Sequence, residues 1–152
     1  MKKYYLIIIF FCVTNNFCID QNKTISSLEV TLSVSRTAFQ IDEAIILTTT
    51  VTNASKSVVK FCKYHSPFEG IANEIFVVTK NGKPLDYQGI LKKRVPPIKD
   101  DFITLQPEAS TSCRVSISEK YNMVNKGEYT IRFMGSSISQ LPNSNEIKVL
   151  IQ

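Results

Sequence analysis

The sequence predicts an all-β protein that folds as a two-sheet β-sandwich with Greek-key connections. Short stretches in which apolar and polar residues alternate recur along most of the chain, and this period of two is typical of strands with one buried face. Turn-forming residues separate the stretches. No long stretch has the i, i+3, i+4 apolar spacing of an amphipathic helix. Many short strands at this spacing favour a sandwich over a barrel.

The alternation is clearest at 28–34, 45–51, 113–117 and 129–133. In chain order, strands are expected at 28–34, 45–51, 58–62, 75–79, 85–88, 102–105, 113–117, 129–133 and 147–151.

Three features stand out between and within these strands. The Asn81-Gly82 pair predicts a hairpin, because Asn-Gly suits a type I′ turn. The connection 90–101 contains Pro96-Pro97, which keeps it out of central strands. Tyr129 is expected either to form a tyrosine corner, with its hydroxyl bonded to nearby backbone, or simply to pack in the core.

Residues 1–19 are expected to form a signal peptide. Lys2 and Lys3 precede the apolar run 6–13, which is too short to span a bilayer and ends at polar residues. A buried N-terminal strand is the alternative. Cys18 raises the question of a lipid anchor, but residues 15–17 lack the small side chains that such processing prefers. We therefore expect one exported domain over 25–152, secreted, periplasmic or on the cell surface, without a transmembrane segment.

The cysteines predict one structural disulfide. Cys12 and Cys18 belong to the signal region, so the exported chain keeps Cys62 and Cys113, an even pair in an oxidising compartment. On the predicted strand, Cys113 faces inward with Val115 and Ile117. Two free, buried thiols packed as small hydrophobic groups are the alternative.

The charge balance argues against a nucleic-acid partner. Removing Lys2 and Lys3 from 18 basic residues leaves 16 against 13 acidic ones, a net charge near +3. This is too mild for a nucleic-acid-binding surface, which needs a basic face or stripe. Lys92, Lys93 and Arg94 form the one basic run of the exported chain, in the 90–101 connection.

Catalytic motifs are missing. The sequence has one histidine, His65, so H-E-x-x-H and any site that needs two histidines are excluded. A serine nucleophile elbow, a P-loop and a dinucleotide-binding glycine motif are also absent. The acidic pairs Asp42-Glu43 and Asp100-Asp101 are typical of turns. We therefore expect no cofactor, no metal site and no enzyme activity.

Several short segments occur in an order that is characteristic of one family. They are 64–70 (YHSPFEG), 76–84 (FVVTKNGKP), 87–94 (YQGILKKR), 102–110 (FITLQPEAS), 121–123 (YNM) and 127–130 (GEYT). Together they resemble the N-terminal domain of peptidyl-Lys metalloendopeptidases of the aspzincin class, across roughly residues 28–134. The first segment is similar to that family's W-N-T-P-x-E-G turn, and the fourth to its Y-x-x-L-x-P-G-x-S. This sequence departs from the family where His65 replaces asparagine and Glu108 replaces glycine.

The resemblance implies an immunoglobulin-like sandwich, exported, and associated in relatives with a zinc protease domain whose motifs this sequence lacks. The leading hypothesis is a binding or accessory module for an extracellular protease, which it contacts through Lys92, Lys93 and Arg94. The alternative is a structural or adhesive domain of the envelope or surface, which a lipid at Cys18 would favour.

Overall fold

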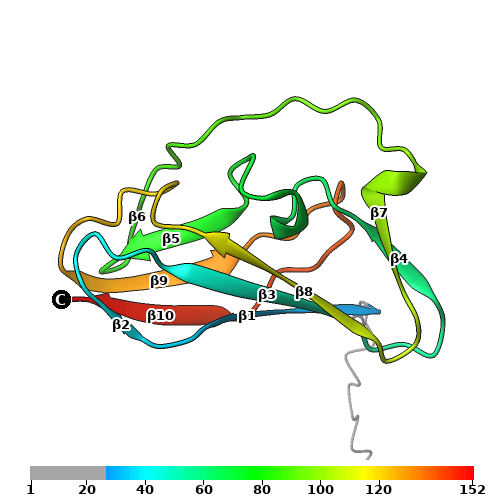
Figure 1. Cartoon of the computed structure of the whole chain (residues 1–152), viewed down its shortest axis with the longest axis horizontal. Coiled ribbons are helices and arrows are strands. Elements are labelled where there is room, and N and C mark those ends of the chain that lie inside the picture. The colour runs from blue at the N-terminus through cyan, green and yellow to red at the C-terminus, as the bar shows by residue number, and fades with distance from the viewer. Residues whose placement is uncertain (1–26) are drawn as a thin grey trace, which may run out of the picture.

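The computed structural model describes residues 27–152, and all of its sheets are visible in Figure 1. The first sheet is antiparallel, and its strands are β1 (Leu28–Val34), β3 (Ile46–Asn53) and β8 (Ser110–Ser116), in that order. The second sheet has the order β2 (Ala38–Phe39), β10 (Glu146–Ile151), β9 (Gly127–Phe133), β5 (Phe76–Lys80) and β6 (Lys83–Pro84). Among the strands of residues 27–152, only β2 and β10 pair in parallel.

A separate two-stranded ribbon consists of β4 (Val59–Cys62) and β7 (Phe102–Leu105). Two 3₁₀ turns, η1 (Pro67–Glu69) and η2 (Lys99–Asp101), follow β4 and precede β7. The prediction of an all-β protein is thus confirmed within residues 27–152. The predicted signal peptide and Cys18 lie outside the described residues. Between residues 27 and 152, no helix has the length and apolar character needed to cross a membrane.

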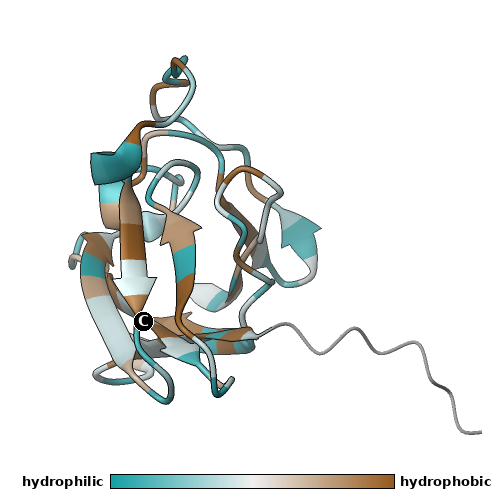
Figure 2. Ribbon diagram, turned by 90° about the vertical axis from the view of Figure 1, so that its right-hand side faces the viewer, coloured by the Kyte–Doolittle hydropathy of each residue, from teal (hydrophilic) through white to brown (hydrophobic). Residues whose placement is uncertain are grey.

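The core lies between the two larger sheets and follows the period-two pattern. Alternate residues of β9 are fully buried, namely Tyr129, Ile131 and Phe133, and the strands in Figure 2 are accordingly banded in brown and teal. The rings of Phe76 and Phe133 meet edge to face, 5.9 Å apart. Burial of such side chains contributes about 1.5–3 kcal/mol each, so this layer holds the two sheets together.

The Asn81-Gly82 hairpin is confirmed. Both residues have positive φ, 48° and 77°, as a type I′ turn requires, and Lys80 pairs with Lys83 across them. The strand expected at 85–88 does not form: the return arm is β6, and Tyr87 bridges instead to Tyr121. Pro84 has no N–H for a ladder, and this favours an early end to the arm.

Tyr129 makes the interaction of a tyrosine corner. Its ring is fully buried, and its hydroxyl donates a 2.6 Å hydrogen bond to the backbone oxygen of Asn125, four residues earlier. The two alternatives for Tyr129, a corner and core packing, therefore hold together.

The disulfide prediction is wrong in this structure, because Cys62 and Cys113 are both free thiols. Cys113 does lie on the inner face of its sheet, opposite the buried Thr49. Cys62, however, belongs to the ribbon, where it pairs with Phe102 and donates its backbone N–H to Ser139. The two cysteines therefore occupy different sheets with different neighbours. Burial raises the pKa of the Cys113 thiol to about 11, as expected for an inert packed cysteine.

Candidate binding site

The turn after β4 is built by its own sequence. The Ser66 hydroxyl accepts the Phe68 N–H (3.2 Å) and donates to the Lys63 carbonyl (2.6 Å). Pro67 is the first residue of η1, and Gly70, at φ 80°, ends it. A serine cap, a first-turn proline and a terminal glycine are the residues that favour such a turn at these positions. The 64–70 segment therefore has a defined shape that places Tyr64, His65 and Glu69.

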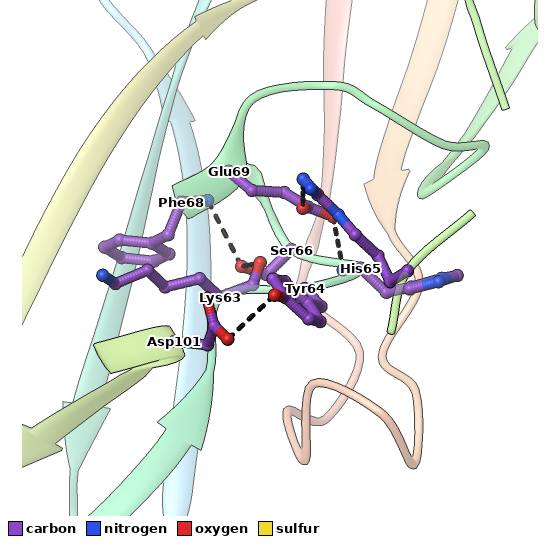
Figure 3. A network of polar contacts seen from close by, with 8 residues as sticks. Lys63, Tyr64, His65, Ser66, Phe68, Glu69 and Asp101 are labelled. Atoms are coloured by element: carbon purple, nitrogen blue, oxygen red, sulfur yellow. Dashed lines mark hydrogen bonds and ion pairs between the residues drawn. The ribbon is translucent and has the colours of Figure 1, made fainter. Parts of the chain in front are cut away.

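Glu69 connects this turn to the long 85–98 connection. Its side chain is only 7% exposed, and it forms an ion pair with Arg94, whose side chain is 23% exposed. The other carboxylate oxygen of Glu69 accepts the His65 N–H at 2.8 Å (Figure 3). His65 has φ 54°, in the left-handed region where asparagine and histidine are enriched. The Glu69 carboxylate thus accepts a hydrogen bond from the strained backbone at His65 and forms an ion pair with Arg94, which is distant in sequence.

Tyr64 contacts both Arg94, at its ring, and Asp101, at its hydroxyl. The Arg94 guanidinium lies 4.7 Å from the centre of the Tyr64 ring, within cation–π range. The Tyr64 hydroxyl donates to an Asp101 oxygen at 2.8 Å (Figure 3). The Ile98 N–H donates to the same oxygen at 2.9 Å. These bonds lower the pKa of Asp101 below its ordinary value, the Ile98 bond most strongly. The bond to Asp101 also raises the pKa of Tyr64.

The 85–98 connection arches away from the sheets in Figure 1, yet it is fastened at both ends. Near its start, the Tyr87 hydroxyl bonds to the carbonyl oxygens of Ile71 and Ile90, each at 3.0 Å. The Lys92 N–H donates to the Ala72 carbonyl at 3.0 Å. Arg94 and Ile98 then fasten the distal half through Glu69 and Asp101. Between these points the side chains of Leu91 and Val95 are exposed.

A hollow of about 540 Å³ lies between this connection and the turn, and we call it the cationic hollow. This volume is within the range of small-ligand sites. Its lining residues are Tyr64, His65, Asn73, Lys92, Lys93, Arg94, Val95, Pro96, Pro97 and Ile138. None of the ten is acidic, so the lining combines cations, donors and apolar side chains.

Two nitrogen atoms beside the cationic hollow are buried without a hydrogen-bond partner: Nδ2 of Asn73 and Nε of Arg94. Asn73 as a whole is 8% exposed. A buried donor without a partner costs about 1–3 kcal/mol, and native structures contain few of them. Unpaired buried donors that line one hollow favour a binding role for it.

The predicted site residues differ in their surroundings. Lys92 and Lys93 are exposed, and among residues 27–152 their ammonium groups have no ion-pair partner. Arg94 instead is held between Glu69 and Tyr64. All three line the cationic hollow. No group of three or more His, Cys, Asp or Glu residues within 27–152 is placed to hold a metal ion.

Sequence reasoning missed Asn73, Glu69 and Asp101 as members of this site. Asp101 appeared only as a turn acid, and a single asparagine between strands gives no signal of any kind. Glu69 lay within a segment that resembled a family turn, and this was the one clue available. What joins the three is a fold that brings residues 64–73 against residues 92–101.

The sequence has a relative among curated proteins. Over 91 residues it is 32% identical to an extracellular protease of Aeromonas hydrophila, and the match covers 60% of this chain and 26% of that protease. The chain therefore spans about a quarter of the relative's length. This supports the predicted relationship to part of an extracellular protease. No family model matches the sequence.

Solved structures with a similar arrangement are more distant. A CARDB domain of Pyrococcus furiosus is 11% identical, with 82% of this chain and 94% of that one covered and a TM-score of 0.42. A β-glucosidase of Listeria innocua is 14% identical, with 84% and 16% covered and a TM-score of 0.43. TM-scores below 0.5 are too low for either likeness to support an assignment.

Proposed function

We propose that this protein is a non-catalytic binding or accessory domain that acts together with an extracellular protease. The observation that carries the proposal is the 32% identity to part of such a protease from Aeromonas hydrophila. The single histidine of the sequence and the missing zinc motif favour an accessory role over a catalytic one. Export, through the predicted signal peptide at 1–19, belongs to the same proposal.

The contact surface in this proposal is the cationic hollow with Lys92 and Lys93 at its rim. The two lysines are exposed on a connection whose ends are fastened by Tyr87, Glu69 and Asp101. A segment that is already ordered loses less conformational entropy on binding. Rigid sandwiches commonly bind partners through such loops.

The strand order supports an immunoglobulin-like form of the sandwich. One sheet has the order β1-β3-β8 and the other contains β10-β9-β5. The chain therefore crosses from one sheet to the other between β8 and β9, whereas β9 and β10 are neighbours in one sheet. The tyrosine corner at Tyr129, on a strand that lies between β10 and β5, is a feature of that fold. We include this fold in the proposal, with the loop ends as binding surfaces.

Affinity capture coupled to an activity assay tests the function. The purified protein is immobilised, culture medium of the producing cells is passed over it, and bound proteins are identified by mass spectrometry. We expect a secreted protease to be retained, and its rate of casein hydrolysis to change when the protein is added in solution. The Lys92→Ala/Lys93→Ala variant should retain less protease, whereas Lys83→Ala/Lys126→Ala, which alters two exposed lysines elsewhere, should retain as much.

Retention of envelope components without any protease would overturn the proposal and leave the structural or adhesive alternative. Intact-mass measurement of the protein from its own cells tests export separately. We expect a chain that begins near residue 20, whereas an acyl group on Cys18 would favour the surface-attached alternative.

A further inference from the structure

The cationic hollow has an excess of hydrogen-bond donors. Arg94, Lys92 and Lys93 line it together with the side chain of Asn73, and no lining residue is acidic. Glu69 is the neighbouring carboxylate, but both of its oxygens are occupied, one by the His65 N–H and the other by Arg94. The two lysines therefore have no acceptor from residues 27–152, and a ligand of opposite charge fits the site electrostatically.

Two of the residues that line the hollow have a buried nitrogen without an acceptor. Asn73 is more than nine-tenths buried and lines the hollow, and its Nδ2 has no acceptor. Arg94 also lines the hollow, and its Nε is likewise without an acceptor, although its terminal nitrogen pairs with Glu69. A carboxylate has two acceptor oxygens, so a single group of this kind offers one acceptor to each of the two donors.

The remaining lining is apolar and exposed. Val95 is 74% exposed and Ile138 is 47% exposed, and Pro96 and Pro97 lie next to Val95. A small inorganic anion would leave these side chains in water. An acidic residue flanked by apolar residues would cover them, and burial of apolar surface is the main driving force of most protein association.

We infer that the cationic hollow binds an acidic peptide segment of a protein partner, with an Asp or Glu carboxylate at Asn73 and Arg94 and apolar neighbours against Val95 and Ile138. Lys92 and Lys93 attract this segment from the rim. The inference deepens the proposed function and rests on it, because it names the chemistry by which the same surface recognises its partner.

Side-chain NMR of the ¹⁵N-labelled protein tests the inference at the atoms concerned. The probe is the capped peptide Ac-Leu-Asp-Leu-Asp-Leu-NH₂, and its control replaces both aspartates with asparagine. We expect saturable shifts of the Asn73 side-chain amide and Arg94 Nε–H signals with the acidic peptide, and at least tenfold weaker binding of the control. Because charge carries part of the attraction, affinity should fall as salt is raised.

Substitutions test whether the acidic peptide binds in the cationic hollow. Asn73→Leu should weaken acidic-peptide binding about tenfold, and Lys92→Ala/Lys93→Ala should weaken it at low salt more than at high salt. Lys83→Ala/Lys126→Ala is the matched control and should bind as the parent does. If Asn73→Leu loses its dispersed backbone spectrum, Asn73→Ser is used, and a folded variant of undiminished affinity would contradict the role of Asn73.

Three further outcomes have defined meanings. Equal affinity for the acidic and amide peptides, or no shift at millimolar peptide, overturns the inference. Equal affinity for hexanoate overturns its peptide part, since a carboxylate on any apolar chain would then suffice. A protein that captures the protease yet ignores the acidic peptide fails this inference alone, because the capture experiment does not depend on the probe.

Discussion

The sandwich core and the loop end around Glu69 are held together by different means. Between the sheets, stability is spread over many buried apolar side chains such as Ile131 and Phe133. At the loop end a short chain of polar contacts runs from Asp101 through Tyr64 and Arg94 to Glu69. It adds to the packing of the Phe68 ring against Phe61. Regions with few buried apolar contacts open at lower free energy than the core. The loop end is therefore expected to open locally at a lower free energy than the sheets.

The largest expected effect comes from a core truncation. Phe133→Ala removes a fully buried ring that packs against Phe76, and such a cavity costs about 3–5 kcal/mol of unfolding free energy. Urea denaturation measures the loss. Val95→Ala at the loop end is the matched control, because Val95 is exposed and its truncation should stay within about 0.5 kcal/mol. Similar losses for both variants would remove the contrast between the two regions.

Asn53, a buried polar residue of the sandwich, tests whether polar contacts also stabilise the region between the sheets. The side chain of Asn53 is fully buried; its Nδ2 donates to the carbonyls of Ser57 (2.7 Å) and Gln106 (3.0 Å). Its oxygen accepts the Ser55 N–H at 2.9 Å. Asn53→Ala leaves these groups without partners, and we expect a loss of about 2–4 kcal/mol. Asn125→Ala, at an exposed asparagine, is the control for urea denaturation and should be neutral. An equal loss there would contradict this account.

Arg94→Met tests the loop end by itself. Methionine keeps an apolar stem but leaves Glu69 with only the His65 N–H, and an unpaired buried carboxylate of this kind costs about 1–3 kcal/mol. The cost should be local: hydrogen exchange of the His65 and Lys92 amides should quicken, while that of Ile131 should not change. The double variant Arg94→Met/Glu69→Gln should regain part of the lost unfolding free energy, because it no longer has an unpaired carboxylate at residue 69. Equal acceleration at Ile131 would mean that the two regions unfold as one.

Sequence patterns predicted the sandwich better than the site because each strand has its own periodicity. The expected strands at 28–34 and 102–105 coincide with β1 and β7, and Asn81-Gly82 encodes its turn locally. The prediction that Cys62 pairs with Cys113 was wrong because the sequence does not show which sheet each strand joins. The two cysteines lie in different sheets. Asn73 and Asp101 belong to the site only through contacts with residues distant in the sequence.

Two departures from the pattern that the sequence resembles fall at left-handed backbone positions. Glu108 and His65 replace a glycine and an asparagine of that pattern, and both have positive φ, 61° and 54°. Glycine and asparagine are the residues that adopt this conformation with the least strain. At both positions this chain therefore holds a residue that adopts the left-handed conformation at a higher cost.

The smallest expected effect is a pH dependence at the outer end of the polar chain. Hydrogen bonds from the Ile98 N–H and Tyr64 hydroxyl lower the pKa of Asp101 in the folded protein. Its ionised form therefore stabilises the fold at pH values above the ordinary aspartate range near 4, and this stabilisation is lost as the pH falls through the lowered pKa. The pKa of Tyr64 is raised, so its contribution is present below about pH 10 and is lost at higher pH.

Asp101→Asn keeps a carbonyl that accepts both hydrogen bonds but cannot ionise. Urea denaturation of the parent and the variant between pH 7 and pH 2.5 should show a small difference in unfolding free energy at neutral pH that shrinks below pH 4. Hydrogen exchange at the Ile98 amide should follow the same course, because that N–H donates to Asp101. A constant difference across the range would mean that the ionisation of Asp101 does not stabilise the fold. The loop end would then be held mainly by the ion pair of Arg94 with Glu69.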